Sequence, residues 1–583
     1  MSRKENVADP VNIADLFLVS AEQYGDREAL KYRVGHHYES LTYGELRTEA
    51  LKLAKSLQKL GLKLGDRAII FSENRPEWVV CDLALVMLGC VNVPVHSVLS
   101  AVQLEVIIKE IKPKVLFFSD QNVDIKLLEI AKTVEGIEHL ISFEDLKTDG
   151  FKKLRFFKQL VDESKLTGTE EQSMVKTARE ISGDTVASII YTSGTSGHMK
   201  GVKLTHNNFV FDTLGLMNWV DIYPEDKFLS ILPLSHVFER TVGYYVALYS
   251  GASIGYSLDI ASVSQEMKER KPNIIIAVPR LFEKIYERVM AKVNKNFMTK
   301  TLFRYAFQVK KEGNNETLNK LFDQYLFSKI RTEFGGEVRF FVSGGAALPP
   351  KIGKFFAILG LPILEGYGLT ETSPVIATNR LEDYKFGTVG PVLDGVEVKI
   401  CDGGEICVKG PNVSPGYIKD SDNVDNFKDG WFYTGDLGYF DRQGFLAISG
   451  RKKDLIVLTT GKKVSPGIVE EALESSIYVE QSFVFGEGRK HIGAVIVPNF
   501  EALKEKYPKM SLAKMLKDDK ARKFLADDFL KSTNSLASVE KIRKFILAKE
   551  PFSIENGELT PKLSLRRHII QARYQEEIES IYS

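Results

Sequence analysis

The chain has 583 residues, which is too long for one hydrophobic core and predicts two to four folding units. Its 78 basic and 77 acidic side chains leave a net charge of +1, so no overall field favours nucleic acid or an anionic membrane as a partner. Four cysteines without Cys-x-x-Cys or Cys/His ligand spacing argue against a metal or redox site and favour a reducing compartment. We expect all four to be packing residues: Cys81, Cys90, Cys401 and Cys407.

The N-terminal residues are polar and lead to no apolar core of a signal peptide, so we expect a cytoplasmic protein. The most hydrophobic stretch, residues 78–95, approaches the length of a membrane span. It contains Asp82, Asn92 and Pro94, however, and these suit a buried helix that runs into a strand better than a transmembrane helix.

From residue 13 to about 380, helical stretches alternate with short apolar runs such as residues 67–71, 114–118 and 273–278. This alternation is typical of parallel strands joined by crossover helices, and it predicts either one large α/β unit or two similar halves. Beyond residue 387 glycines and short strands dominate, and an α+β pattern with a helix-rich end follows residue 451. We therefore expect an N-terminal domain of residues 1–450 and a C-terminal domain of residues 451–583.

Two segments rich in basic and aromatic residues interrupt the α/β pattern, at residues 151–160 and in the helical stretch of residues 286–334. Lysines beside aromatic residues suit the lipid interface, so either segment could give peripheral contact with a membrane. The simpler alternative is a solvated helix that packs its aromatic side chains inward.

The clearest chemical signal is the run Y-T-S-G-T-S-G-H-M-K-G at residues 191–201. It follows an apolar run expected to be a buried strand, and it precedes a helix that Thr205 or Asn207 could cap. Its glycines can turn successive N–H groups toward an anion, its hydroxyl groups add donors, and Lys200 adds a mobile positive charge. These features predict a polyphosphate site, although Met199 and Gly201 beside the lysine do not match a Walker A loop. A plain surface turn is the alternative.

Two further segments suit a nucleotide. Residues 342–349 end a strand in a turn of small residues, which leaves room for a planar nucleobase. In residues 364–372, Tyr367 can stack on a base, and Glu371 between two threonines can hold the Mg²⁺ that accompanies ATP. A glycine-rich turn is the simpler explanation of this second segment.

Two charged residues further along suit a ribose. Asp436 follows a tight turn in residues 431–438, where its carboxylate could accept hydrogen bonds from two ribose hydroxyls. Arg451, in a basic run at residues 450–454, could bind ribose or phosphate. Each residue alone is better explained by a surface turn or a solvated charge.

Together and in this order, these segments resemble the AMP-forming adenylate superfamily of acyl-CoA synthetases, nonribosomal adenylation domains and luciferases. Residues 231–240 and 450–457 look most like those of long-chain fatty acid:CoA ligases. The resemblance covers nearly the whole chain. It implies an α/β fold with a large N-terminal domain of parallel and mixed sheets flanked by helices, a small β-rich subdomain, and a small mobile α+β C-terminal domain.

The resemblance also implies the chemistry. The carboxylate of a fatty acid attacks the α-phosphate of ATP to give acyl-AMP and pyrophosphate, and the CoA thiol then displaces AMP. ATP, Mg²⁺ and CoA are the implied cofactors. The implied roles are phosphate binding by Thr192, Ser193, Gly194, Thr195, Ser196, Gly197 and Lys200; adenine binding by Ser343, Gly344, Gly345, Ala346 and Tyr367; cofactor binding by Gly366 and Gly368 on either side of that tyrosine; α-phosphate binding by Thr370; Mg²⁺ binding by Thr192 and Glu371; and ribose binding by Asp436 and Arg451. Lys453 occupies the hinge position, and His236 is expected beside the carboxylate and the CoA tunnel.

The chain departs from the family near its C-terminus. The lysine that usually reaches the α-phosphate and the substrate carboxylate falls on Ser564 here. Lys562 lies two residues earlier, and residues two apart in an extended chain point to the same side, so Lys562 could replace it after a shift of at most about 7 Å. The alternative is that Lys562 is a surface charge.

We therefore expect a long-chain fatty acid:CoA ligase without a nucleic-acid partner. An amino-acid substrate would need an acidic residue near its amine, and Glu239 is the one candidate, which we expect instead to be a structural partner of Arg240 or a neighbour. Two alternatives stay open: an enzyme that uses acyl carrier protein as its acceptor, and a homologue that binds the acyl adenylate but has lost turnover.

Overall fold

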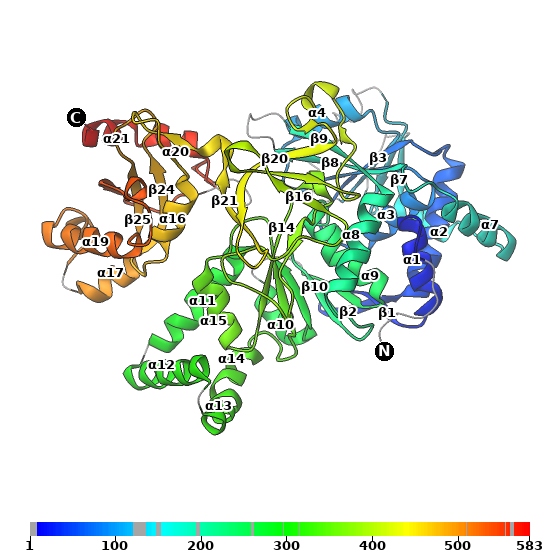
Figure 1. Ribbon diagram of the computed structural model, residues 1–583. Helices are drawn as coiled ribbons and strands as arrows, with labels where there is room; N and C mark the ends of the chain where they lie inside the picture. Colours follow the sequence, from blue (N-terminus) through cyan, green and yellow to red (C-terminus); the bar gives the residue numbers. More distant parts are fainter. Residues whose placement is uncertain are drawn as a thin grey trace. The chain divides into compact units, whose positions relative to one another are not determined.

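The structure is a computed structural model, and it describes residues 9–119, 136–146, 153–193, 199–257, 262–294, 296–313, 315–508, 510–553, 556–559 and 565–582 (Figure 1). The chain divides into two compact units. Unit 1 comprises Met1–Leu348, Ile352–Val398 and Val408–Tyr433, and unit 2 comprises Pro349–Lys351, Lys399–Cys407 and Thr434–Ser583. The last division falls inside strand β20 (Trp431–Phe440), and the domain boundary at residue 450 stays a prediction.

Unit 1 contains two eight-stranded sheets. In the first sheet the central pairs are parallel, and the two edge strands pair antiparallel with their neighbours. Its strands, in spatial order, are β15 (Ala377–Thr378), β14 (Ile363–Tyr367), β13 (Phe340–Ser343), β12 (Ile274–Ala277), β10 (Lys227–Ser230), β11 (Ser253–Tyr256), β1 (Glu28–Val34) and β2 (His37–Thr42).

The second sheet is parallel from β8 to β7, and β9 and β18 continue it as antiparallel strands. Its strands, in spatial order, are β18 (Gly416–Tyr417), β9 (Met199–Thr205), β8 (Val186–Ser193), β4 (Val91–Val95), β3 (Arg67–Phe71), β5 (Val115–Phe118), β6 (His139–Ser142) and β7 (Leu154–Phe156). The predicted α/β fold class with parallel and mixed sheets is confirmed.

Helices connect and cover these strands (Figure 1). Four of them begin at a Ser or Thr whose side chain completes a capping box, which satisfies N–H groups of the first turn: α2, α4, α7 and α8. Within the described part of the chain before residue 360, the helices are α1 (Ile13–Gln23), α2 (Tyr43–Lys59), α3 (Pro76–Met87), α4 (Ala101–Ile111), α6 (Phe157–Asp162), α7 (Gly168–Arg179), α8 (His206–Trp219), the π-helical η2 (Glu239–Tyr245), α9 (Val246–Ser250), α10 (Val263–Arg270), α11 (Pro279–Asn294), α12 (Phe297–Glu312), α13 (Glu316–Phe322), η3 (Asp323–Phe327), α14 (Ser328–Thr332) and α15 (Pro350–Ile358).

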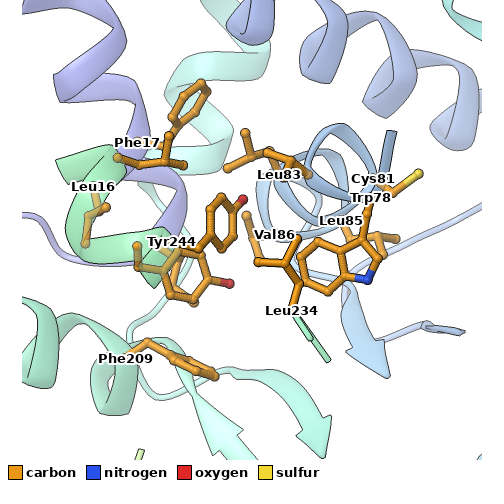
Figure 2. Close-up of a cluster of buried hydrophobic side chains, with 14 of the residues drawn as sticks. Leu16, Phe17, Trp78, Cys81, Leu83, Leu85, Val86, Phe209, Leu234 and Tyr244 are labelled. Atoms are coloured by element: carbon orange, nitrogen blue, oxygen red, sulfur yellow. The ribbon is translucent and has the colours of Figure 1, made fainter. Parts of the chain in front are cut away.

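The main core of unit 1 gathers side chains from helices α1, α3, α8 and η2 (Figure 2). Phe17, Trp78 and Tyr244 are fully buried there, and the rings of Trp78 and Tyr244 meet edge to face. All of β4 and all of α3 except Glu77 are buried, so the prediction of a buried helix that runs into a strand at residues 78–95 is confirmed. Among the described residues no helix is both long and apolar enough to cross a membrane.

A buried ion pair crosses this core. Arg240 of η2 and Asp82 of α3 pair with no solvent exposure. Arg240 also donates to the Ser188 hydroxyl of β8 at 2.7 Å, and Asp82 accepts from the Asn92 amide of β4 at 2.7 Å. Of the two expectations for Glu239, a structural partner of Arg240 or a neighbour, the first is wrong, because Asp82, distant in the sequence, pairs with Arg240.

Unit 2 has an α+β arrangement. In its first part, the second half of β20 pairs antiparallel with β21 (Leu446–Arg451). Its main sheet has three strands, β24 (Val479–Phe485), β25 (Gly493–Pro498) and β26 (Lys544–Leu547). Its other elements include β22 (Ile456–Val457), β23 (Lys463–Val464), α16 (Pro466–Glu474), α17 (Phe500–Lys506), α18 (Leu512–Met515), α19 (Asp519–Ser532), α20 (Arg567–Arg573) and α21 (Gln575–Tyr582).

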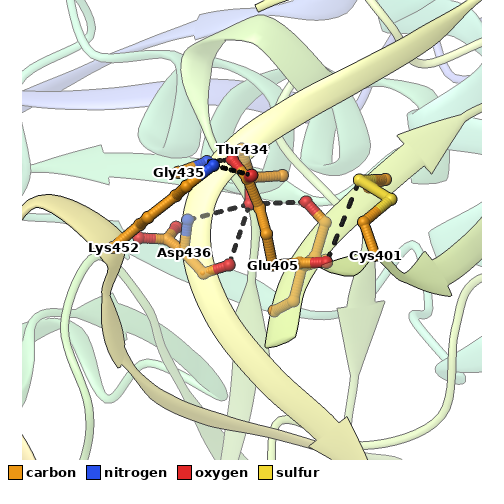
Figure 3. The surroundings of a disulfide bond; sticks show 8 residues. Cys401, Glu405, Thr434, Gly435, Asp436 and Lys452 are labelled. Carbon is orange, nitrogen blue, oxygen red and sulfur yellow. Dashed lines mark hydrogen bonds and ion pairs between the residues drawn. A yellow bond between two sulfur atoms is a disulfide. The ribbon is translucent and has the colours of Figure 1, made fainter. Parts of the chain in front are cut away.

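The cysteines do not all act as packing residues. Cys81 and Cys90 are free and buried, as expected, but Cys401 and Cys407 form a disulfide with their Cα atoms 6.3 Å apart (Figure 3). The turn between them brings them together: Gly404 N–H donates to the Cys401 carbonyl, and Cys401 N–H donates to the Glu405 carbonyl. The prediction failed because this spacing matches no recognised cysteine motif.

We expect Asp82→Asn to destabilise unit 1 by about 3–5 kcal/mol, because it leaves the Arg240 guanidinium buried without a counter-ion. Urea unfolding followed by tryptophan fluorescence measures the change, since Trp78 lies over the Arg240 guanidinium. A matched Asp82→Leu/Arg240→Met variant buries no charge and should lose less stability than Asp82→Asn alone. An Asp82→Asn protein as stable as the wild type would contradict this account.

Candidate active site

The glycine-rich run forms part of a β-hairpin. β8 ends at Ser193 and β9 begins at Met199, and Thr192 pairs with Lys200 across the two strands. Gly194, Thr195, Ser196 and Gly197 lie outside the described residues. Strand β9 lies between the loop and the expected helix, α8, which starts at His206. Thr205, one of the two predicted cap candidates, caps α8.

Gly201 has a packing role. A Cβ atom at this position would collide with the side chain of Ile418, whose N–H donates to the Gly201 carbonyl at 2.9 Å. The strand β18 therefore requires glycine here, because its residues approach β9 closely. This accounts for one of the glycines attributed above to anion binding.

Tyr417 of β18 connects two predicted site residues, and the sequence analysis missed it. Its hydroxyl donates to Glu371 Oε1 at 2.7 Å, and the Lys200 ammonium lies 4.8 Å from the centre of its ring. Burial is the main reason that the pKa of Tyr417 lies above its usual value, and the negative charge of Glu371 raises it further. The hydroxyl therefore keeps its proton and donates it to the hydrogen bond with Glu371. Asp422 adds a second contact for Lys200, with 3.6 Å between the charged atoms.

Thr370 and Glu371 lie in the 3-10 turn η4 (Thr370–Thr372), and both are largely buried. This turn contacts β9, and the Glu371 carbonyl accepts a hydrogen bond from Ser414 N–H at 2.8 Å. Thr192, Lys200 and Glu371 thus lie on neighbouring elements. The carboxylate of Glu371 and the hydroxyl of Thr192 are the hard oxygen donors that Mg²⁺ prefers, so this donor set fits the ion.

The predicted adenine residues gather at the ends of β13 and β14. Ser343 at the end of β13 pairs with Glu365, which places Gly366 and Tyr367 beside the turn of residues 343–346. The Ser343 hydroxyl is buried and has no hydrogen-bond partner among the residues that the structure describes. Gly345, at φ 82°, and Ala346 are exposed in this turn.

Gly344 and Gly368 are required by close packing. A Cβ atom at Gly344 would lie 2.9 Å from the ring of Phe238, and one at Gly368 would collide with the carbonyl of Pro374. The approach of Phe238 also joins the turn of residues 343–346 to the loop that carries His236.

His236 lies between β10 and η2 and is half-buried. Its Nδ1 accepts a hydrogen bond from Phe238 N–H at 3.2 Å, so the neutral ring carries its proton on Nε2. Asn74, which the sequence analysis did not single out, fixes the preceding loop: its amide donates to the Leu232 carbonyl at 2.7 Å, and its carbonyl oxygen accepts from Leu234 N–H at 2.8 Å.

Glu239 begins η2, three residues after His236, and is completely buried. Burial raises the pKa of its carboxyl group to about 8. The carboxyl group is therefore protonated at neutral pH. A substrate amine could contact it only inside the core, so Glu239 is a core residue and does not suit the recognition of an amine.

In unit 2, Asp436 and Arg451 occupy opposite positions on β20 and β21 and form an ion pair, with 3.0 Å between Arg451 Nε and Asp436 Oδ1. Glu405, next to the disulfide, accepts from Gly435 N–H at 3.0 Å and from the Lys452 ammonium at 2.6 Å (Figure 3). These bonds fix the chain on both sides of the Asp436–Arg451 pair. Lys453 is exposed in the turn η7 (Lys452–Asp454), whereas Lys562 and Ser564 lie outside the described residues.

Comparison with known proteins gives consistent results along the chain. A family model described as "AMP-binding enzyme" matches residues 17–418, and another described as "AMP-binding enzyme C-terminal domain" matches residues 453–583. The long-chain-fatty-acid–CoA ligase FadD15 of Mycobacterium tuberculosis is 32% identical over 93% of this chain and 92% of its own length.

Two other similarities bear on acceptor and fold. The chloroplastic long-chain-fatty-acid–[acyl-carrier-protein] ligase AEE15 of Arabidopsis thaliana is 29% identical over 98% of this chain and 86% of its own. The crystal structure of the anthranilate CoA ligase AuaEII in complex with anthranoyl-AMP superimposes with a TM-score of 0.74 at 18% identity, covering 98% of this chain and 99% of that one. This last similarity establishes a shared fold.

Glu239 predicts a specific pH dependence of stability. Its folded pKa of about 8 lies above the unfolded value of 4.5, so between these values the folded state keeps a proton that the unfolded state has lost. Glu239 therefore makes the unfolding free energy fall as the pH rises through this window, by up to about 1.4 kcal/mol per pH unit. Glu239→Gln removes this contribution.

Urea unfolding at several pH values between the two pKa values measures the effect. We expect the slope of unfolding free energy against pH to be more positive for Glu239→Gln than for the wild type. The difference should correspond to about one proton. The exposed Glu316→Gln is the control for the same chemical change. Identical slopes for Glu239→Gln and the wild type would show that Glu239 does not hold its proton in the folded state.

Proposed function

This chain belongs to the AMP-binding enzyme family and is an AMP-forming acid–thiol ligase, and we propose that it joins long-chain fatty acids to CoA. The observation that carries the proposal is the constellation of Lys200, Tyr417 and Glu371, which holds a cation and a carboxylate together beside the glycine-rich hairpin. Long-chain fatty-acid ligases that are about 30% identical over nearly the whole chain support the choice of acid.

The proposed reaction has two steps. A carboxylate oxygen of the fatty acid bonds to the α-phosphorus of ATP as the bond to the β-phosphate oxygen breaks, which yields acyl-AMP and releases pyrophosphate. The sulfur of CoA then attacks the acyl carbon and the bond to AMP breaks, so that the thiol loses its proton and AMP leaves. Since the first step brings two anions together, it needs cations and N–H donors rather than a protein nucleophile.

The residues of unit 1 suit the first step. We assign Lys200, Thr192, Ser193 and the loop of residues 194–197 to the β- and γ-phosphates, and Thr370 to the α-phosphate. Glu371 and Thr192 would hold Mg²⁺, which when bound would offset the negative charge of the phosphates. The turn of residues 343–346 with Gly366, Tyr367 and Gly368 is assigned to adenine, and the buried Ser343 hydroxyl supports this, because it still has a hydrogen bond to make.

The remaining assignments follow the family pattern. Asp436 and Arg451 bind the ribose, Lys453 acts at the hinge, and Lys562 approaches the α-phosphate in place of the expected lysine. His236, which Phe238 N–H holds in a defined orientation, lies beside the substrate carboxylate and the path of CoA. We place this activity in the cytoplasm, with a mobile C-terminal domain of residues 451–583.

A second acceptor has support of its own. The similarity to a ligase named for acyl carrier protein makes such a protein the alternative to CoA. Ser564, at the expected lysine position, is the reason to retain a third possibility, a homologue that binds the acyl adenylate without turnover.

Product analysis distinguishes these functions. The protein is incubated with ATP, Mg²⁺ and fatty acids of graded length, with and without CoA, and the products are identified by mass spectrometry. We expect acyl-CoA and AMP in equal amounts, with a preference for long chains. Acyl-AMP that accumulates even with CoA, and is consumed on adding acyl carrier protein, would instead favour the carrier-protein ligase. Absence of any adenylate would refute the proposed function.

Tyr417 gives a test of the site itself. Tyr417→Phe removes the hydrogen bond to Glu371 but keeps the ring beneath Lys200, whereas Tyr417→Leu removes both contacts. A hydrogen bond to a charged group contributes about 1.5–3 kcal/mol, so we expect the Phe variant to need about ten-fold more Mg²⁺ for half-maximal binding of ATP. The Leu variant should also bind ATP more weakly when Mg²⁺ is absent.

Calorimetric titration of ATP at several Mg²⁺ concentrations gives both quantities. Tyr439→Phe, at an exposed position of β20, serves as the matched control and should bind like the wild type. If the Phe and Leu variants shift the Mg²⁺ requirement no more than this control, Tyr417 does not position Glu371.

A further inference from the structure

Helices α12 and α13 and the turn η3 expose a group of large apolar side chains, which we call the arm patch. Each of these residues is between 45% and 81% exposed, and they are Phe297, Met298, Leu302, Tyr305, Leu321 and Tyr325. In Figure 1 α12 and α13 lie at the end of their helix group farther from the strands of the first sheet. Apolar side chains that gather on an exposed surface can mark an interaction site, whereas single exposed ones need no explanation.

The arm patch is continuous across the two helices. α12 packs against α13, and the ring of Tyr305 meets that of Phe322 edge to face, with 5.9 Å between the ring centres. Leu321 precedes Phe322, and Tyr325 lies one turn later on the same side. The expectation that such helices pack their aromatic residues inward is therefore only partly met.

α12 contributes to the core through its opposite face. Phe303 and Ala306 are buried, and Phe303 packs edge to face on Phe327. The arm patch is thus a second apolar face on α12, whose first apolar face packs into the core. Folding of unit 1 does not require it, so its apolar character calls for an external partner.

Charge identifies the kind of partner. Lys300, Arg304 and Lys311 follow one another at helical spacing along the edge of the arm patch near Phe297, and Glu312 is the sole acidic residue of α12. A row of cations beside aromatic and aliphatic side chains matches the boundary between anionic headgroups and acyl chains.

We propose that the arm patch docks the protein on the surface of an anionic lipid bilayer, with α12 lying in the plane of the interface. The apolar side chains enter the boundary of the acyl chains, and Lys300 and Arg304 contact the headgroups. This proposal depends on the exposed surface of α12, α13 and η3 alone, and it stands or falls independently of the proposed ligase activity.

Vesicle flotation of the full chain tests it. The wild type should float with vesicles of phosphatidylcholine and phosphatidylglycerol, float much less with phosphatidylcholine alone, and lose binding as salt is raised. Phe297→Ser/Met298→Ser/Tyr325→Ser should weaken binding at least ten-fold, since three exposed apolar anchors are removed. Lys300→Glu/Arg304→Glu should abolish the preference for the anionic vesicles.

A matched control removes apolar side chains of similar exposure elsewhere: Val424→Ser/Tyr439→Ser/Leu530→Ser. This control should float like the wild type. Equal flotation of the arm-patch triple variant and the control would overturn the proposal. A wild type that floats with neither kind of vesicle would also overturn it. If the wild type is a dimer by light scattering, does not float, and becomes a monomer in the triple variant, the arm patch binds a second copy and the proposal is wrong.

Discussion

The buried ion pair of Arg240 and Asp82 is the constraint on which the geometry of unit 1 depends. It joins η2 to α3 and, through Ser188, to β8, so it fixes two helices against a strand of the second eight-stranded sheet. β8 leads directly to Thr192, and the loop before η2 carries His236. Two parts of the candidate site are therefore positioned from one buried contact. Such a pair adds little net stability, because both charges lose their hydration, but it tolerates few alternative arrangements of the surrounding elements.

Local signals in the sequence were sufficient for most of the fold. Apolar runs of strand length at residues 67–71 and 273–278, separated by amphipathic helices, gave the α/β class, because periodicity depends only on near neighbours. The cap at Thr205 and the buried helix at residues 78–95 were predicted for the same reason. The order of several motifs was enough to identify the family, which no single motif could do.

The errors concern contacts between residues far apart in the chain. Glu239 stands next to Arg240, and Asp82 lies far from it in sequence, yet the fold brings Asp82 to the guanidinium. Tyr417 was missed because its significance comes only from the pairing of β18 with β9, which places it between Lys200 and Glu371. The loop of residues 194–197 and Lys562 lie outside the described residues, so their assigned roles stay predictions.

The short segment from Ser414 to Tyr417 holds two parts of the site in register. Ser414 donates through its N–H to the Glu371 carbonyl and through its hydroxyl to the Lys203 carbonyl, and Tyr417 follows on the paired strand. Side chains alternate between the faces of a strand, so one residue inserted here would turn Tyr417 away from Glu371. Insertions and deletions between homologues should therefore avoid this segment and occur in loops that bind nothing. A mutational library can vary the amino acids of this segment while keeping its length fixed.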